Sequence, residues 1–162
     1  MQFSGLAFWD GKLYATTLSS IFPRGAVLVF TESKSQYTWD RSWQRTQVIY
    51  MPSTCVYSNT LSVGVDSSRI FVCNRTNGLV YVFSTQGKFI REHADRKSSH
   101  MCALDEGVML EAEYGTKLSI LDQAGRWHDN VIPELTRGVQ GAVVYDKKLY
   151  VASLYLQMFE IF

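Results

Sequence analysis

The feature that most constrains this chain is a strand-rich phrase that recurs four times along its 162 residues. Each copy contains an apolar strand, a turn that begins with Asp, a second apolar strand, a small-polar loop and a third strand. The third strands end at Phe30, Phe83, Leu121 and Phe162. The last two intervals are close to the period of about forty residues that is typical of four-stranded repeat units. The first interval is longer, which indicates an insertion, and Ser33 to Arg45 is its expected place.

A repeat of this length that contains only strands predicts β-propeller blades. We therefore expect an all-β, β-propeller-like fold of about four blades, with no long helix because no 3.6-residue apolar period is present. The chain is expected to be a single propeller domain, residues 1–162, or a propeller fragment. Its blades are expected at residues 4–51, 52–95, 96–135 and 136–162. The chain ends before a fourth strand of the last blade, so that blade is predicted to be incomplete.

The Asp residues of the four turns are Asp10, Asp66, Asp105 and Asp146. Asp hydrogen-bonds to its own downstream backbone, so these residues are interpreted as hairpin turns. Four equivalent carboxylates could instead surround a cation, but each is expected between two strands at one rim and away from the axis. The innermost strands are small and apolar, which suits the crowded centre of a toroid.

Composition limits the function classes. The 16 basic and 15 acidic residues give a formal net charge of +1, so no bulk attraction to nucleic acid or membrane follows. Cys55, Cys73 and Cys102 form no close pair, and a reducing, cytoplasmic location is expected. No signal peptide and no apolar run of membrane-spanning length are seen. Asn74-Arg75-Thr76 reads as a glycosylation sequon, a pattern that is common by chance.

Two segments of the second copy, SVGVDSSRIFVCN (residues 62–74) and VYVFSTQGKFIRE (residues 80–92), resemble the NHL repeats found in the propellers of TRIM-NHL proteins and their relatives. The resemblance covers most of the chain, and it is specific mainly in the second blade. The ending of the second strand, Cys73-Asn74, departs from the Ala-Asp of that family. WD40 repeats are disfavoured, because Trp9-Asp10 and Trp39-Asp40 do not close a third strand.

The resemblance implies a ring that normally has six blades, and this chain supplies about four. Four blades could close alone, two chains could pool their blades, or the sequence could belong to a longer polypeptide. The last blade would otherwise leave an apolar edge from Val151 to Phe162 exposed to water. We therefore favour an identical subunit or further polypeptide over self-closure.

Catalytic signatures are absent from the sequence. It has no G-x-S-x-G elbow, no H-E-x-x-H and no Walker loop. The histidines are scattered, and Glu111 with Glu113 is interpreted as a solvated pair. We expect no catalytic residue, no metal ligand and no cofactor.

Loops that join second to third strands, and loops that join blades, emerge on the same face of a propeller. We call this the loop face. Cations interleaved with aromatic rings there are suited to single-stranded RNA or an acidic peptide. The candidate ligand-binding residues are Arg24, Arg75, Arg96, Lys97, Arg137, Tyr114 and Tyr155.

The expected function is a non-catalytic binding or scaffold module that engages a protein, a peptide or single-stranded RNA through the loop face. The chain is expected to form a homo-oligomer or part of a longer polypeptide, with no membrane partner. Two alternatives stay open: a propeller hydrolase or lyase with an axial metal, and a purely structural subunit of a larger assembly.

Overall fold

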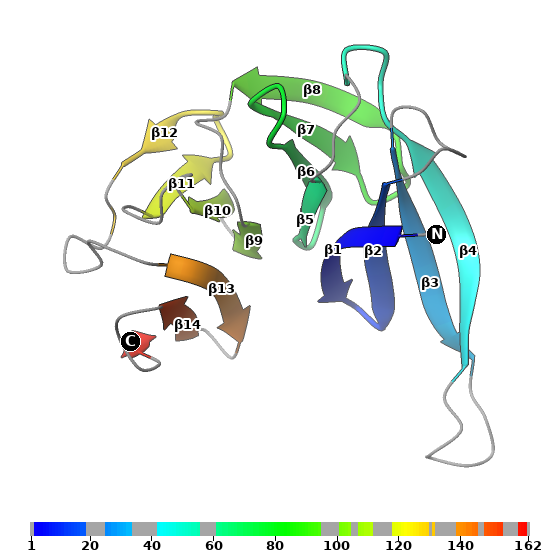
Figure 1. The fold of residues 1–162 in the computed structure, drawn as a ribbon, viewed down its shortest axis with the longest axis horizontal. Coiled ribbons are helices and arrows are strands. Elements are labelled where there is room, and N and C mark those ends of the chain that lie inside the picture. Colours follow the sequence, from blue (N-terminus) through cyan, green and yellow to red (C-terminus); the bar gives the residue numbers. More distant parts are fainter. Residues whose placement is uncertain are drawn as a thin grey trace.

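The computed structural model places four antiparallel sheets around a common centre (Figure 1). It describes residues 2–18, 25–33, 42–55, 61–94, 101–104, 107–111, 118–129, 131, 139–145, 148–153 and 159–161. Within these ranges every regular element is a strand. No helix in the described part of the chain is long and apolar enough to cross a membrane.

Each sheet is one blade, and its strands lie in chain order from the centre outward. Blade 1 contains β1 (Gln2–Trp9), β2 (Lys12–Leu18), β3 (Ala26–Ser33) and β4 (Ser42–Tyr50). Blade 2 contains β5 (Leu61–Val65), β6 (Arg69–Asn74), β7 (Leu79–Ser84) and β8 (Phe89–Ala94). Blade 3 contains β9 (Met101–Leu104), β10 (Gly107–Glu111), β11 (Leu118–Asp122) and β12 (Trp127–His128). Blade 4 contains β13 (Val139–Tyr145), β14 (Lys148–Ser153) and β15 (Phe159–Ile161).

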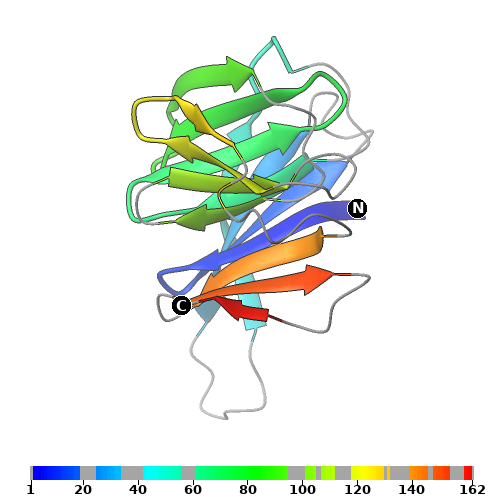
Figure 2. The same cartoon turned by 90° about the vertical axis from the view of Figure 1, so that its left-hand side faces the viewer.

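The predicted all-β, propeller-like fold with an incomplete last blade is confirmed. The inner strands β1, β5, β9 and β13 pack in succession, so the blades follow one another around an axis. In the side view of Figure 2, the short strands of blade 4 run side by side near the C-terminus. Over the described ranges, the sheet of blade 4 has three strands, where each of the other sheets has four.

The hydrophobic core lies between blades, because each sheet is apolar on both faces. The first cluster joins blades 1 and 2 through side chains such as Tyr14, Val29 and Tyr81. The second joins blades 2 and 3, and the third joins blades 3 and 4. All three cysteines are buried, as expected for small hydrophobic side chains.

Close backbone approach holds the inner strands together. A Cβ added to Gly64 would lie 3.0 Å from the backbone nitrogen of Ala103, so β5 and β9 meet where a side chain has no room. A Cβ added to Gly5 would lie 2.9 Å from the carbonyl oxygen of Leu61. That carbonyl accepts hydrogen bonds from the hydroxyls of Ser4 at 2.7 Å and Thr16 at 2.9 Å. These hydroxyls therefore satisfy a carbonyl at the seam between blades 1 and 2.

Asp10 and Asp66 lie in hairpin turns, as predicted, but the two turns differ in geometry. Trp9 pairs with Lys12, so Asp10 and Gly11 form the two-residue loop, with φ of 48° and 69°. Positive φ at both positions is the requirement of a type I′ turn. Asp66 instead closes its hairpin with Arg69 and accepts hydrogen bonds from the backbone of Ser68 and Arg69, each at 2.8 Å. Asp105 and Asp146 lie outside the described residues.

The insertion in blade 1 is partly strand. The insertion was expected to span Ser33 to Arg45, but β4 already begins at Ser42 and pairs with β3 as far as Ser33. A register shift at Val29 and Phe30 leaves Thr46 as the extra residue. The ring of Trp43 packs edge-on against Phe8, at a centroid distance of 6.2 Å, which favours the longer strand.

The outer strands also join consecutive blades. Gln47 of β4 donates a hydrogen bond to the carbonyl of Gln86, in the β7–β8 turn, at 2.8 Å. Arg91 of β8 likewise donates a hydrogen bond to the carbonyl of Gln123, in the β11–β12 turn, at 2.8 Å. Each of these turns therefore rests on the outer strand of the preceding blade.

His93 lies beside Arg91 in the seam between blades 2 and 3, against Gly125. Its Nε2 is buried and has no hydrogen-bond partner within the described part of the chain. Burial, reinforced by the Arg91 guanidinium, lowers the pKa of His93 from its ordinary value of 6.5. The folded protein therefore holds this imidazole in its neutral form at a pH where the unfolded chain takes up a proton.

We expect Gly64→Val to lower the free energy of unfolding by about 1–3 kcal/mol, because the added carbons must displace the backbone of β9. Urea unfolding followed by circular dichroism measures the change. Gln44→Val, on the exposed part of β4, is the control and should stay within about 0.5 kcal/mol of the parent. Equal stability of the parent and Gly64→Val would contradict the close approach of β5 to β9.

We expect stability to fall as the pH drops through the unfolded-state pKa of His93, near 6.5. The sign follows from the lowered folded-state pKa, because the unfolded state binds more protons than the folded state in this range. His93→Gln should flatten the dependence of the urea midpoint between about pH 5 and pH 7.5. Parallel pH profiles for the parent and the variant would show that His93 is not responsible.

Candidate binding site: the loop face and the axial cavity

The structure places one of the predicted ligand-binding residues, Arg75, on the loop face. Arg75 follows β6 in the turn to β7 and is partly exposed. The other predicted residues lie outside the described residues: Arg24, Arg96, Lys97, Arg137, Tyr114 and Tyr155.

Two asparagines shape the turn that carries Arg75. The Oδ1 of Asn74 accepts a hydrogen bond from the backbone of Thr76 at 2.9 Å, and the backbone of Gly78 donates to the carbonyl of Asn74 at 2.9 Å. The Oδ1 of Asn77 accepts from the backbone of Leu79 at 3.2 Å. Asn side chains favour such turns because they replace backbone hydrogen-bond partners over two residues.

The same turn is fastened to residues 51–55, which follow the outer strand of blade 1. The Nδ2 of Asn74 donates to the sulfur of Cys55 at 3.3 Å. The Nδ2 of Asn77 donates to the carbonyl of Thr54 at 3.3 Å and to the hydroxyl of Tyr81 at 2.7 Å. That hydroxyl donates in turn to the carbonyl of Thr54 at 3.1 Å. We call residues 51–55 and 74–78 together the loop platform.

Buried polar groups make the loop platform stiff. The side chains of Asn74 and Tyr81 are 0% exposed, and both are hydrogen-bonded. Burial is the main cause that raises the pKa of Tyr81 to about 12, so its hydroxyl keeps its proton at neutral pH. A satisfied buried network favours one conformation over its alternatives. Arg75 is therefore presented on a turn that is already ordered.

The burial of Asn74 also bears on the sequon. A glycan needs an accessible amide nitrogen, and this nitrogen lies inside the fold and donates to Cys55. The folded protein therefore has no room for a glycan at Asn74.

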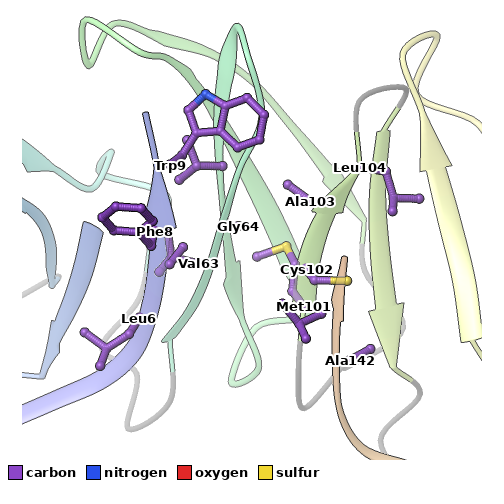
Figure 3. A pocket seen from close by; sticks show the side chains of 13 residues that line it. Leu6, Phe8, Trp9, Val63, Gly64, Met101, Cys102, Ala103, Leu104 and Ala142 are labelled. Carbon is purple, nitrogen blue, oxygen red and sulfur yellow. The ribbon is translucent and has the colours of Figure 1, made fainter. Parts of the chain in front are cut away.

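A cavity of about 260 Å³ lies at the axis (Figure 3). Trp9 and Cys102 are the lining residues whose side chains carry a polar hydrogen, and burial raises the pKa of the Cys102 thiol to about 12. The other lining side chains are hydrocarbon or thioether. Figure 3 shows Leu6 and Phe8 on the side of β1 that points away from Val63, and Trp9 on the opposite side. The lining residues are Leu6, Ala7, Phe8, Trp9, Val63, Gly64, Val65, Met101, Cys102, Ala103, Leu104, Ala142 and Val143.

The chemistry of this cavity is that of an apolar surface. Among the described residues that line it there is no carboxylate, imidazole or amine, and the neutral Cys102 thiol is a poor nucleophile. Across the described ranges, no group of three or more His, Cys, Asp or Glu side chains is placed to hold a metal ion. The small residues expected at the axis are found there.

Sequence reasoning missed the network that orders the loop platform. The only signal was the Cys73-Asn74 ending, which departs from the NHL pattern. The departure coincides with the asparagine that joins the two segments.

No protein-family model matches the chain. No curated protein matches it. Among solved structures, the computationally designed Ika4 protein is similar over 99% of this chain and 91% of its own, with a TM-score of 0.62 and 11% identity. Glutaminyl cyclase from Myxococcus xanthus is similar over 98% of this chain and 65% of its own, with a TM-score of 0.60 and 15% identity. BamB from Moraxella catarrhalis is similar over 93% of this chain and 40% of its own, with a TM-score of 0.59 and 18% identity.

This chain therefore spans less than two thirds of the length of each of these two natural proteins. At such identities the likeness is one of fold. It supports the propeller architecture and assigns no activity.

We expect Asn74→Ala to destabilise the protein by about 1–3 kcal/mol, because it removes the buried partner of the Thr76 backbone and of Cys55. Hydrogen exchange should speed up in residues 51–55 and 74–78 and change little in blade 3. Ser67→Ala, in an exposed turn at the opposite face, is the control. Unchanged exchange in both loops would mean that Asn74 does not order the loop platform.

Proposed function

We propose that this chain is a non-catalytic propeller module that binds a protein or peptide partner through its loop face, at the loop platform. The observation that carries the proposal is the ordered turn that presents Arg75. Binding to a surface that is already ordered loses less conformational entropy than binding to mobile loops. Propellers are scaffolds whose loops carry function, so the loop face is the first surface to test.

An acidic segment is the partner that suits this site best. The guanidinium of Arg75 has a planar fork of donors that matches a carboxylate. The blades are assigned to the NHL type on the residue pattern of blade 2, and this assignment is part of the proposal. The cytoplasm is the proposed location, because an odd, sparse set of cysteines suits a reducing compartment.

The axial cavity supports binding over catalysis. A propeller hydrolase or lyase with an axial metal, the alternative function, would need Asp, Glu, Asn or His side chains directed at the axis. The described lining supplies apolar side chains instead. The likeness to glutaminyl cyclase keeps an enzyme as the alternative at the level of fold alone. Metal analysis of the purified protein separates the two, since a stoichiometric bound metal would favour the enzyme.

We expect a fluorescent acidic copolymer of Glu and Tyr to bind, and Arg75→Ala to weaken its binding about tenfold, which corresponds to the loss of a charge-assisted hydrogen bond. Fluorescence anisotropy measures the affinity. Arg75→Lys keeps the charge and loses the fork, so its affinity should lie between the two. Arg126→Ala removes an equal charge from the β11–β12 turn, on the opposite face, and should leave the affinity unchanged.

A short random-sequence single-stranded RNA is the second probe. If the RNA binds more tightly than the copolymer, and Arg75→Ala lowers the salt slope by about one, RNA replaces the peptide as the partner class. If neither probe binds, the loop-face proposal fails, and a purely structural subunit becomes the better description.

A further inference from the structure

One face of blade 1 is apolar, and no hydrophobic cluster of the described residues joins it to another blade. In β1, Leu6 and Phe8 are 63% and 64% exposed. Strand pairing puts Leu13 and Ala15 of β2, and then Leu28 and Phe30 of β3, on the same side of the sheet. We call these six residues the open face: Leu6, Phe8, Leu13, Ala15, Leu28 and Phe30. Ala15 and Leu28 are each 1% exposed, so the strongly exposed part of the open face lies along β1, at Leu6 and Phe8. Phe3, 47% exposed, and Trp43, 37% exposed, extend it.

The open face corresponds residue by residue to a buried face of blade 2. The closing pairs of the first hairpins, Trp9 with Lys12 and Asp66 with Arg69, set the alignment. Leu6 and Phe8 then correspond to Val63 and Val65, and the pairing extends the match across the next two strands. Every matching residue of blade 2 is apolar and at most 5% exposed: Val63, Val65, Ile70, Val72, Tyr81 and Phe83.

In blade 2, this face is covered by the opposite side of blade 1, which we call the forward face. Tyr14, Val27, Val29 and Ile49 of that forward face belong to the same cluster as the buried face of blade 2. The direction repeats along the chain, because the forward faces of blades 2 and 3 cover blades 3 and 4. The open face of blade 1 therefore has the composition and the register of a surface that receives a forward face.

Among the described residues, the forward face that no other blade covers is that of blade 4. Ala142 and Val151 point toward blade 3 and are buried. Val143, the next residue along β13, points the other way and is 55% exposed, with Tyr150 paired beside it. Phe8 and Val143 both line the axial cavity, and both side chains remain exposed, at 64% and 55%.

We propose that a second copy of this chain covers the open face, with the forward face of its blade 4. The copy supplies the kind of face that blade 2 receives, and a two-fold axis satisfies both open faces at once. The blades of the two copies then form one closed ring, twice the four sheets of a single chain, within the range of about four to eight blades that propellers use. This inference does not depend on the function of the loop platform.

The first test is light scattering coupled to size-exclusion chromatography on the whole chain. We expect twice the chain mass of 18.5 kDa. Phe8→Glu and Val143→Glu should each give a folded monomer, because a carboxylate in either face opposes burial. Ile90→Glu, on an outer strand where Ile90 is 51% exposed, should stay dimeric. A monomeric parent, or dimers of both face variants, would overturn the proposal.

Mixing tests the head-to-tail arrangement. A dimer of one Phe8→Glu chain and one Val143→Glu chain has two interfaces. One interface contains both charges and the other contains neither, so the mixture should recover part of the dimer. A mixture that stays monomeric would overturn this arrangement. Circular dichroism melting shows whether each variant folds.

Cross-linking provides a test that does not need these charged variants to fold. The double variant Phe8→Cys, Val143→Cys is oxidised and run on a denaturing gel without reductant. The native cysteines are buried, so a disulfide should form between the two introduced residues. A covalent dimer supports the second copy. An internal disulfide within one chain would show self-closure. The absence of any cross-link would show that the open face and the forward face of blade 4 do not meet. Either result overturns the proposal.

Discussion

Close backbone contact at the axis is the constraint on which the arrangement of the sheets depends. The inner strands approach until glycine is the residue that fits, at Gly5 against β5 and at Gly64 against β9. Such contact removes water from backbone carbonyls, and an unsatisfied buried carbonyl is costly. The hydroxyls of Ser4 and Thr16 meet this need at Leu61. Packing between the broad sheet faces then follows, because the inner strands set the spacing of the blades.

The repeat was sufficient to predict the strands, the four sheets and the incomplete last blade, since apolar runs and turns are local properties of a sequence. It was insufficient for the register of the turns. Asp10 and Asp66 look alike in the repeat, but one lies inside a two-residue turn and the other closes a hairpin with its carboxylate. The difference arises from the following residues, since Gly11 permits a positive φ and the Ser68 backbone supplies a donor.

The candidate site was predictable only in part. The order of strands was enough to place Arg75 on the loop face. The contacts that order its turn join residues from different blades, as Asn74 does with Cys55, and no local pattern encodes such a pair. The exposed face of blade 1 was missed for a similar reason. A strand that is apolar on both sides indicates that both sides are buried, but it does not show which segment covers each side.

The β7–β8 and β11–β12 turns each bond to the outer strand of the blade that precedes them in the chain, so the contacts between blades follow the order of synthesis. Gln47 of β4 is in place before the β7–β8 turn leaves the ribosome, and Arg91 of β8 precedes the β11–β12 turn in the same way. Chains are made from the N-terminus, and their parts fold as they emerge. Blades 2 and 3 thus each meet a finished template at both their inner and their outer radius. Synthesis and assembly therefore run in the same sense around the axis, and each blade docks without waiting for residues that are not yet made.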